Sequence, residues 1–340
     1  MKRVLFLLKE RHYSHSRASY GLINSATHIA EFLQTHGHTC KVVEVFDGNS
    51  IDKEVYEFKA DIVVLEALWC PVYKIKELME IPRYRRIKWI VRVHSDIGYL
   101  SAESHAIKLL NEYADLHSHK LILSLNSKKF VEALSETLKY DFTYLPNIIT
   151  IKEPIICDYR DERRHIDIGC FGAMRLLKNQ CFQALAAVQA ANILDKKLLF
   201  HITPNLGEQY DSVRMNLEEM FCKSEHELVI HDWLPNEAFQ KLVTKMDLGL
   251  QISYTESFNI VSADFINNNR LVVVSDAIDW LPPIMRTSTT DYDEAARKIV
   301  YMYKHRNSEW LKNRARTNLL YYNELSKREW LHFIHEHHRH

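Results

Sequence analysis

Short apolar runs alternate with longer segments of helical periodicity along almost the whole chain. In the first half the apolar runs read RVLFLL, CKVVEVF, ADIVVLEAL, KWIVRVH and KLILSL, and helical periodicity covers residues 21–36 and 105–117. A strand followed by a helix and a second strand forms a βαβ unit, in which the strands are parallel and helices cover both faces of the sheet. The alternation therefore predicts an α/β fold with doubly wound parallel sheets.

The alternation stops at YLPNIITIKEP, where Pro146 and Pro154 bracket an extended segment, and then starts again. In the second half, helices are predicted between apolar runs at 180–193, 209–221, 237–244 and 258–267. Two helical stretches, 291–305 and 309–335, close the chain. Exposed proline-containing segments commonly separate domains. We therefore expect two Rossmann-like domains, 1–150 and 151–315, and a C-terminal helix and tail, 316–340, that packs back on the first domain. Ligands of such sheets bind at the carboxyl ends of the strands, so the two domains should face a shared crevice.

Composition excludes several classes of protein. The chain has 44 Lys plus Arg and 44 Asp plus Glu, so its formal net charge is zero and no overall basic field directs it toward nucleic acid or anionic membranes. No stretch approaches the roughly 18 apolar residues that span a bilayer, and the apolar run 4–8 is too short for a signal peptide. The six cysteines form no CxxC pair, which favours a reducing, cytoplasmic location.

Residues 252–276, ISYTESFNIVSADFINNNRLVVVSD, carry the most specific pattern. An apolar strand leads into a turn, and the helix that follows starts at the carboxyl edge of the predicted sheet, where its unpaired amides and dipole favour phosphate. Glu256 lies just before this helix, and Asp264 lies about six residues into it, roughly 9 Å along its axis. The pattern predicts that Glu256 meets a group just beyond the phosphate and Asp264 meets a ribose. The alternative is that Glu256 only caps the helix and that Asp264 is a solvated surface residue.

This segment resembles the E-x7-E signature of glycosyltransferase family 4, whose members are retaining enzymes of the GT-B fold. The family pattern E-G-F-G-x-x-x-x-E corresponds here to Glu256, Ser257, Phe258, Asn259, Ile260 and the residues up to Asp264. The resemblance implies that Glu256 is catalytic and that the others bind the donor. Ser257 and Asn259 replace two glycines of the pattern, which is expected to narrow the phosphate pocket.

A second match follows the first strand of the second domain, in GCFGAMRLLKN at 169–179. It resembles the phosphate clamp of the family, with Arg175 and Lys178 as the cations and Asn179 in place of the usual glycine. Two cations can offset the charge of a leaving diphosphate without a metal ion. The resemblance implies a catalytic role for both, and the alternative is ordinary surface charge at the start of a helix.

Weaker similarities to the family cover the remainder of the chain. They imply that His94, in RVHSD, is catalytic and lies near the donor sugar and acceptor, and that Trp233 and Leu234 flank the nucleotide base. They also imply that Gly21 belongs to a donor-binding loop at 11–21. A histidine at a strand end is otherwise a structural residue whose ring nitrogens are satisfied internally.

Taken as a whole, the resemblance implies a retaining glycosyltransferase that moves a hexose or pentose from a nucleoside diphosphate sugar to an acceptor hydroxyl. The donor is expected on the domain 151–315 and the acceptor on the domain 1–150. No D-x-D metal signature follows a predicted strand, so metal independence is expected. No cofactor is implied besides the nucleotide sugar itself, which is a substrate.

The acceptor remains open between a glycan, a lipid-linked glycan and a modified DNA base. Two basic segments would favour an anionic acceptor if both face the crevice, although solvated surface charge is the commoner role of such segments. These segments contain Lys9, Arg11, His12, His15 and Arg17, and Arg83, Arg85, Arg86, Lys88 and Arg92. A GT-B sugar nucleotide epimerase or phosphorylase, and a degenerate binding protein without turnover, are the competing functions. The sequence indicates no oligomeric state.

Overall fold

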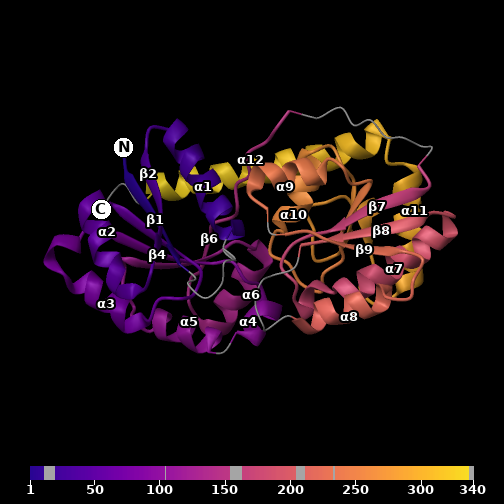
Figure 1. Cartoon of the computed structure of the whole chain (residues 1–340). Coiled ribbons are helices and arrows are strands. Elements are labelled where there is room, and N and C mark those ends of the chain that lie inside the picture. Colours follow the sequence, from indigo (N-terminus) through magenta and orange to yellow (C-terminus); the bar gives the residue numbers. More distant parts are fainter. Residues whose placement is uncertain (11–19, 104, 154–162, 204–210, 233, 337–340) are drawn as a thin grey trace. The chain divides into compact units, whose positions relative to one another are not determined.

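The structure, a computed structural model, describes residues 1–10, 20–103, 105–153, 163–203, 211–232 and 234–336 (Figure 1). These residues divide into two compact units. Unit 1 contains the described residues up to Thr150 and those from Asn323 onward, and unit 2 contains the described residues from Ile151 to Tyr322. The last helix, α12 (Glu309–Glu336), therefore contributes its first part to unit 2 and its last part to unit 1.

Within the described residues, unit 1 is built on a six-stranded parallel sheet with the strand order β2-β1-β3-β4-β5-β6. The strands are β1 (Arg3–Lys9), β2 (Thr39–Val45), β3 (Ile62–Glu66), β4 (Lys88–Val93), β5 (Leu121–Leu125) and β6 (Thr143–Tyr144). The chain moves outward in one direction from β1 to β2 and in the other from β3 to β6. The order therefore reverses between β1 and β3, and the carboxyl ends at such a switch point are where doubly wound sheets bind ligands.

Successive side chains of the strands in unit 1 pack on opposite faces of the sheet. On one face Val4 and Phe6 pack against α1 (Tyr20–Thr35) and the end of α12. On the other face Leu5 and Leu7 join a second cluster, which is covered by α2 (Ile51–Phe58), α3 (Val72–Glu80), α4 (Ile97–Ala102), α5 (Ala106–Ala114) and α6 (Lys128–Leu138). Burial on both faces is the reason that these strands are continuously apolar rather than alternating.

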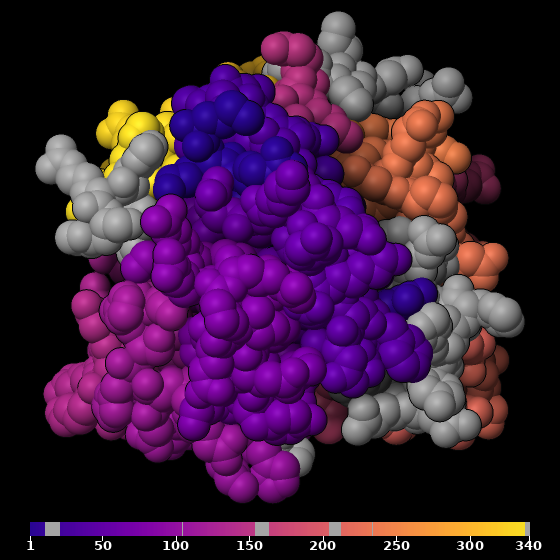
Figure 2. Space-filling model, turned by 90° about the vertical axis from the view of Figure 1, so that its left-hand side faces the viewer, coloured from indigo at the N-terminus to yellow at the C-terminus, as the bar shows by residue number. Residues whose placement is uncertain are grey.

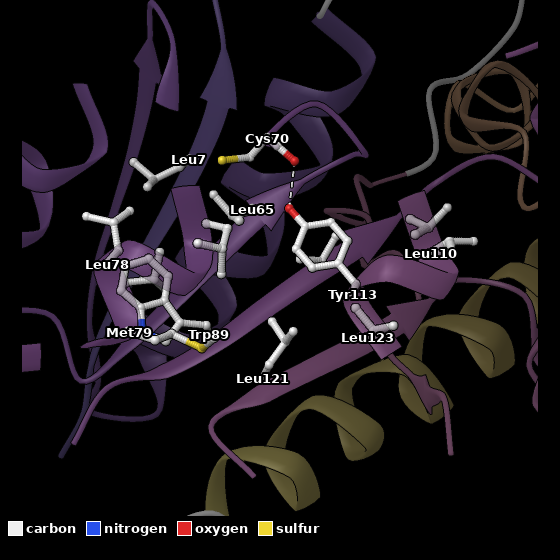
Figure 3. Packing of buried hydrophobic residues seen from close by; sticks show 14 of the residues in the cluster. Leu7, Leu65, Cys70, Leu78, Met79, Trp89, Leu110, Tyr113, Leu121 and Leu123 are labelled. Atoms are coloured by element: carbon white, nitrogen blue, oxygen red, sulfur yellow. Dashed lines mark hydrogen bonds between the residues drawn. The ribbon is translucent and has the colours of Figure 1, made fainter. Parts of the chain in front are cut away.

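Figure 3 shows the second cluster from close by. Trp89 of β4 is completely buried in it, and the hydroxyl of the buried Tyr113 donates a hydrogen bond to the carbonyl oxygen of Cys70 at 2.7 Å. In Figure 2 the surface toward the viewer consists mainly of segments from the first part of the chain, coloured indigo to magenta, that wrap this core.

The end of α12 is anchored in unit 1 by Trp330. This side chain is completely buried, its indole Nε1 donates to the carbonyl oxygen of Pro146 at 2.8 Å, and its ring centroid lies 6.1 Å from that of Phe6. The guanidinium carbon of Arg92 lies 5.5 Å from the centroid of the same indole. The C-terminal segment is thus part of the hydrophobic core of unit 1.

Unit 2 repeats the doubly wound plan, again with six parallel strands among its described residues, in the order β12-β11-β10-β7-β8-β9. Its strands are β7 (His165–Cys170), β8 (Lys197–Ile202), β9 (Glu227–Ile230), β10 (Leu248–Gln251), β11 (Val272–Ser275) and β12 (Arg286–Thr287). Its helices are α7 (Gln180–Ile193), α8 (Asp211–Phe221), α9 (Asn236–Val243), α10 (Ile260–Asn267) and α11 (Tyr292–Lys304). The switch point of this sheet lies between β7 and β10.

Figure 1 shows α9 and α10 on one side of the second sheet and α7 and α8 on the other. Two glycines let α10 approach closely. A Cβ atom added at Gly249 would lie 2.8 Å from ring atoms of Phe265, and one at Gly169 would lie 3.0 Å from the same ring. Because any larger residue would push the phenyl ring of Phe265 away, the two glycines set the distance between α10 and the sheet.

The structure confirms the predicted α/β fold of two doubly wound parallel sheets. Helix α7 has the predicted bounds, whereas α10 begins two residues later than predicted, because Asn259 is its N-cap. Helices α2, α3 and α6 fall in segments for which the sequence predicts no element. Each of them buries only two or three apolar residues, so its periodicity is short. None of the described helices combines the length and the apolar character that crossing a membrane requires.

Replacing Trp330 by Ala should lower the stability of the protein by about 3–5 kcal/mol, because a fully buried tryptophan leaves a cavity and an unpaired carbonyl group. The midpoint of urea unfolding measures this effect. Trp310→Ala, in the same helix but with a side chain 62% exposed, is the matched control and should shift the midpoint little. Equal effects of the two substitutions would contradict the anchoring role of Trp330.

Candidate functional site

Two loops of unit 2 meet at the carboxyl ends of β7 and β10, on either side of the switch point. The first contains Arg175 and Lys178, around the short 3-10 helix Leu176–Lys178 that precedes α7, and the second contains Glu256 and leads into α10. Strands β7 and β10 are hydrogen-bonded neighbours. Two segments that lie almost eighty residues apart in the sequence therefore form one site.

An ion pair joins the two loops. The ammonium group of Lys178 lies against carboxylate Oε1 of Glu256, and the side chain of Glu256 is only 7% exposed. The same Oε1 accepts a hydrogen bond from Nδ2 of Asn259 at 2.8 Å. Burial strengthens a charge-assisted contact of this kind, so the Lys178–Glu256 pair holds the two loops together.

Backbone hydrogen bonds reinforce this connection. The amide of Tyr254 donates to the carbonyl oxygen of Leu177 at 2.9 Å. Gln183 of α7 bonds to both loops, because its Oε1 accepts from the amide of Ile252 at 3.0 Å and its Nε2 donates to the carbonyl oxygen of Lys178 at 2.7 Å. The spacing between Lys178 and Glu256 is therefore set by several bonds, which preorganises the site for a ligand.

Asparagines replace family glycines at two positions, and both have left-handed backbone conformations. Asn179 has φ 59° and ψ 33°, and Asn259 has φ 65° and ψ 86°. Asparagine is among the few residues other than glycine that adopt positive φ readily. The turns that glycine would allow are thus kept. The added side chains are used in hydrogen bonds, from Asn179 to the carbonyl of Thr289 at 3.0 Å and from the amide of Ser262 to Asn259 at 2.8 Å.

The residues next to Glu256 divide into half-buried and buried positions. Ser257, Ile260 and Arg175 are half-buried, whereas Phe258 is 2% exposed. The ring of Phe258 stacks on Tyr322 of α12 at 4.6 Å, so its side chain supports the loop from within the core of unit 2. A contact from this position to a ligand could come only from its main chain.

Asp264 faces α9 from the second turn of α10. Its Oδ1 accepts a hydrogen bond from Nε2 of Gln240 at 2.7 Å, and Oε1 of Gln240 accepts in turn from Asn268 at 2.5 Å. Burial raises the pKa of Asp264 to about 6, although the hydrogen bond from Gln240 acts in the opposite direction. Its carboxyl group therefore titrates close to neutral pH.

The remaining predicted site residues belong to other segments of the chain. Leu234 is half-buried and precedes α9, and Trp233 lies outside the described residues. Gly21 is exposed in the first turn of α1, in unit 1, and the segment 11–19 before it also lies outside the described residues.

His94 belongs to unit 1, at the end of β4, where it contacts a carboxylate that the sequence analysis does not identify. Its Nε2 makes a short hydrogen bond with Oε2 of Glu66, the last residue of β3. Arg92 Nη1 lies 3.1 Å from the same oxygen, and both Glu66 and Arg92 have completely buried side chains. Burial would raise the pKa of Glu66, but the charge of Arg92 and the hydrogen bonds hold it below its usual range. Burial and Arg92 lower the pKa of His94, so its imidazole is neutral at pH 7.

Arg92 extends this contact into a network. It donates to Oδ1 of Asn147 at 2.7 Å and to the carbonyl oxygen of Leu145 at 3.0 Å, and Ser25 of α1 donates to the same Asn147 oxygen at 2.7 Å. A sequence signal for this site exists, since Glu66 and Arg92 interrupt apolar strands and buried charges require partners.

The basic side chains at 83–92 do not gather at the carboxyl edge of the sheet of unit 1. Arg92 is buried against Glu66, and Arg83 forms two hydrogen bonds, at 2.9 and 3.0 Å, with the carboxylate of Asp52. Lys88 begins β4, so Arg83, Arg85 and Arg86 precede the strand and lie at the amino edge of the sheet, opposite the carboxyl edge where His94 lies.

The described residues contain no group of three or more His, Cys, Asp or Glu side chains arranged to hold a metal ion. The loops of unit 2 present two cationic side chains, Arg175 and Lys178. These can hold an anionic ligand by charge and hydrogen bonding.

Several solved structures that are similar to this chain are glycosyltransferases. A glycosyltransferase from Rickettsia africae superposes with a TM-score of 0.67 at 13% identity and covers 99% of both chains. S. aureus TarM, a mutant in complex with fondaparinux, alpha-GlcNAc-glycerol and UDP, gives a TM-score of 0.60 at 14% identity and covers 80% of this chain. The pneumococcal O-GlcNAc transferase GtfA, in complex with UDP and GlcNAc, gives 0.58 at 12% identity and covers 85% of this chain.

The chain spans 54% of the length of TarM and 60% of that of GtfA. These likenesses show that the chain has the GT-B fold. No protein-family model matches the sequence, and no curated protein matches it significantly.

Asn179→Ala should destabilise the protein by about 1 kcal/mol more than Asn179→Gly, because both lose the side-chain hydrogen bonds but only alanine is strained at positive φ. Thermal unfolding of the two variants measures the difference. Asn216, in the middle of α8, is the control position. At this helical position the order of stability should reverse, so that Asn216→Gly is about 1 kcal/mol less stable than Asn216→Ala. Equal stabilities of the two Asn179 variants would contradict the backbone argument.

Asp264→Asn should raise the stability at pH 7.5 by about 1–2 kcal/mol and change it little at about pH 3. The folded-state pKa, about 6, lies above the ordinary value of 3.8, so the carboxyl group's contribution to stability is full below pH 3.8 and is lost as pH rises from 3.8 through 6. Melting temperatures at the two pH values test this. Asp276→Asn, with a side chain 87% exposed, should have no effect at either pH. An Asp264→Asn effect that is independent of pH would contradict the assignment.

Proposed function

We propose that this protein is a retaining glycosyltransferase that moves a sugar from a nucleoside diphosphate sugar to an acceptor hydroxyl. The observation that supports this most directly is the joined pair of loops in unit 2. They place a cation, Lys178, and a carboxylate, Glu256, in contact at the switch point of a doubly wound sheet. A donor whose diphosphate is anionic and whose sugar presents hydroxyl groups needs both kinds of contact.

In this proposal the residues of unit 2 have distinct roles. Arg175 and Lys178 hold the diphosphate, and Glu256 accepts hydrogen bonds from hydroxyl groups of the transferred sugar. Asp264 holds the ribose, while Ser257, Asn259 and Ile260 shape the phosphate pocket at the start of α10. Phosphate contacts from a cation pair and a helix N-terminus stabilise the negative charge that grows as the diphosphate leaves.

The reaction then proceeds with retention at the anomeric carbon. The bond between this carbon and the diphosphate oxygen breaks while the acceptor oxygen bonds to the same face, and a phosphate oxygen of the leaving group takes the acceptor proton. Glu256 is engaged by Lys178 and Asn259, so its role is to orient the sugar rather than to attack it. Charge stabilisation by Arg175 and Lys178 supplies the main lowering of the barrier.

The acceptor is assigned to unit 1, where His94 lies at the carboxyl edge of β4. Glu66 orients its imidazole, and the neutral ring can exchange a hydrogen bond with a hydroxyl group of the sugar or of the acceptor. The basic segment 83–92 offers no anionic-ligand site at this edge. This favours a glycan over a DNA base as acceptor.

A degenerate binding protein without turnover is the competing proposal, because glycines of the family pattern are missing. The left-handed conformations of Asn179 and Asn259 argue against it, since the turns that these glycines provide are kept. UDP in the structures of TarM and GtfA makes uridine nucleotides the first candidates for the donor.

The test combines binding and turnover. Melting temperatures are measured with UDP, GDP, ADP and their sugar conjugates, since a ligand that binds the folded state raises the melting temperature. Wild type should respond to one nucleotide family, and Arg175→Ala should lose this response. Glu256→Gln should keep the response to the free nucleotide but release nucleoside diphosphate from the sugar nucleotide at least about 100-fold more slowly.

Glu237→Gln, at an exposed glutamate of α9, is the matched control and should behave as wild type. Binding without turnover in the wild type, over a panel of glycan acceptors, would favour the degenerate binding protein. Unchanged turnover in Glu256→Gln would remove Glu256 from the catalytic site.

A further inference from the structure

Three side chains of unit 2 form a hydrogen-bonded line that the proposed roles do not use. Asp167 lies on β7, His201 on β8, and His231 directly after β9. Nε2 of His201 lies 3.0 Å from Oδ1 of Asp167, and Nδ1 of His201 lies 2.8 Å from Nε2 of His231. The two imidazole rings are nearly parallel, with centroids 5.1 Å apart and an interplanar angle of 11°, as two rings that share an in-plane hydrogen bond should be. The line runs from the interior of the sheet to its carboxyl edge.

The carboxylate at the inner end fixes the direction of every hydrogen bond in the line. Oδ2 of Asp167 accepts from Arg163 at 2.6 Å, and although burial acts in the opposite direction, the hydrogen bond from His201 helps to lower the pKa of Asp167. An ionised carboxylate only accepts, so Nε2 of His201 carries its proton. When His201 is neutral, its imidazole has one donor and one acceptor nitrogen, and its Nδ1 then accepts from Nε2 of His231.

The same reasoning shows which nitrogen of His231 carries the proton and which carries the lone pair. With its proton on Nε2, the ring presents a lone pair on Nδ1. Burial and the neighbouring His201 lower the pKa of His231, which favours the neutral ring. His231 is half-buried, and no described residue forms a hydrogen bond to its Nδ1. The line thus presents a fixed acceptor at the carboxyl edge of unit 2.

Aromatic contacts connect His231 to α10, the helix that carries Asp264. The ring of Phe265, which follows Asp264 in α10, stacks on Phe171 with centroids 5.9 Å apart. Phe171 in turn lies edge-to-face with His231 at 6.3 Å. Along the sheet, β9 is separated from β7 by β8 alone, which is about 10 Å at two strand spacings. A nucleoside diphosphate bound at the clamp can extend its base over this distance.

We propose that His231, oriented by His201 and Asp167, selects the nucleotide base of the donor by accepting a hydrogen bond from a ring N–H group. The proposal rests on the proposed function, because the ligand is the donor nucleotide. Uracil and guanine carry an N–H group within the ring. In cytosine and adenine the corresponding ring nitrogen bears a lone pair, which would face the lone pair of Nδ1. A site built for a hydrogen bond discriminates strongly against a ligand that lacks it.

The binding experiment compares nucleotides that differ only in this N–H group. Dissociation constants are measured by calorimetry for UDP, GDP, ADP, 3-methyluridine 5′-diphosphate and 1-methylguanosine 5′-diphosphate. Wild type should bind UDP or GDP at least about tenfold more tightly than its methylated analogue and than ADP. His231→Phe, which keeps an aromatic ring against Phe171 but has no acceptor, should lose the preference for the unmethylated nucleotide.

Two further variants separate recognition from folding. His231→Asn, which can place an amide oxygen near the position of Nδ1, should retain part of the preference. His305→Phe, at an exposed histidine of unit 2, should bind as wild type. Equal affinity of wild type for a nucleotide and its methylated analogue, or a preference for ADP, would overturn this proposal while leaving the proposed function intact. Absence of binding to every nucleotide would overturn both.

The tautomers can be measured without any nucleotide. In protein labelled with nitrogen-15 histidine, long-range proton–nitrogen correlation spectra distinguish a protonated ring nitrogen from one with a lone pair. We expect the protons of both His201 and His231 on Nε2, and loss of the fixed tautomer of His231 in His201→Phe. A proton on Nδ1 of His231 would contradict the proposal directly.

Discussion

The contact between the loops that follow β7 and β10 is the constraint on which the candidate site depends. Parallel strands leave their carboxyl ends at one edge, so any two loops at a switch point are near each other. Proximity alone does not fix their geometry. Here the Lys178–Glu256 ion pair, the backbone bond from Tyr254 to Leu177 and the two bonds of Gln183 set it. In the proposed function the fixed distance between this cation and this carboxylate matters, because electrostatic stabilisation is effective only when the groups need not reorganise during the reaction.

The missing glycines have a physical explanation in backbone conformation. A family pattern specifies glycine where the chain needs positive φ or where no side chain fits. Asn179 and Asn259 satisfy the first requirement, since both have φ near 60°. Asn259 also uses its side chain, which caps α10 and holds Glu256. The substitutions therefore keep the turns and add hydrogen bonds that glycine could not make. The sequence analysis also predicts that side chains in place of these glycines narrow the phosphate pocket. That prediction concerns the space left for phosphate and not the backbone conformation.

Unit 1 contains a buried ion pair, between Glu66 and Arg92. Glu66 and Arg92 lie side by side on neighbouring strands, with no exposed side-chain surface. Removing either one would leave an uncompensated charge in the core, so the pair acts as a unit with Asn147 and Ser25. Its outward end is His94, whose ring is held by the carboxylate. In unit 2 the line from Asp167 through His201 to His231 follows the same principle, because a buried carboxylate sets the protonated nitrogen of an imidazole at the edge of the sheet.

The sequence by itself determined the alternation of strands and helices, the doubly wound fold and the two segments that form the core of the candidate site. These follow from local patterns, namely apolar runs, helical periodicity and motif spacing, so they can be read from neighbouring residues. Only the tertiary structure decided which side chains meet. Glu66 joins His94 and His201 joins His231 because β3 lies beside β4 and β8 beside β9, a pairing that no local pattern encodes. The same applies to Arg92, which a basic stretch suggests is exposed and which strand packing buries, because burial depends on the elements that cover a strand rather than on the strand itself.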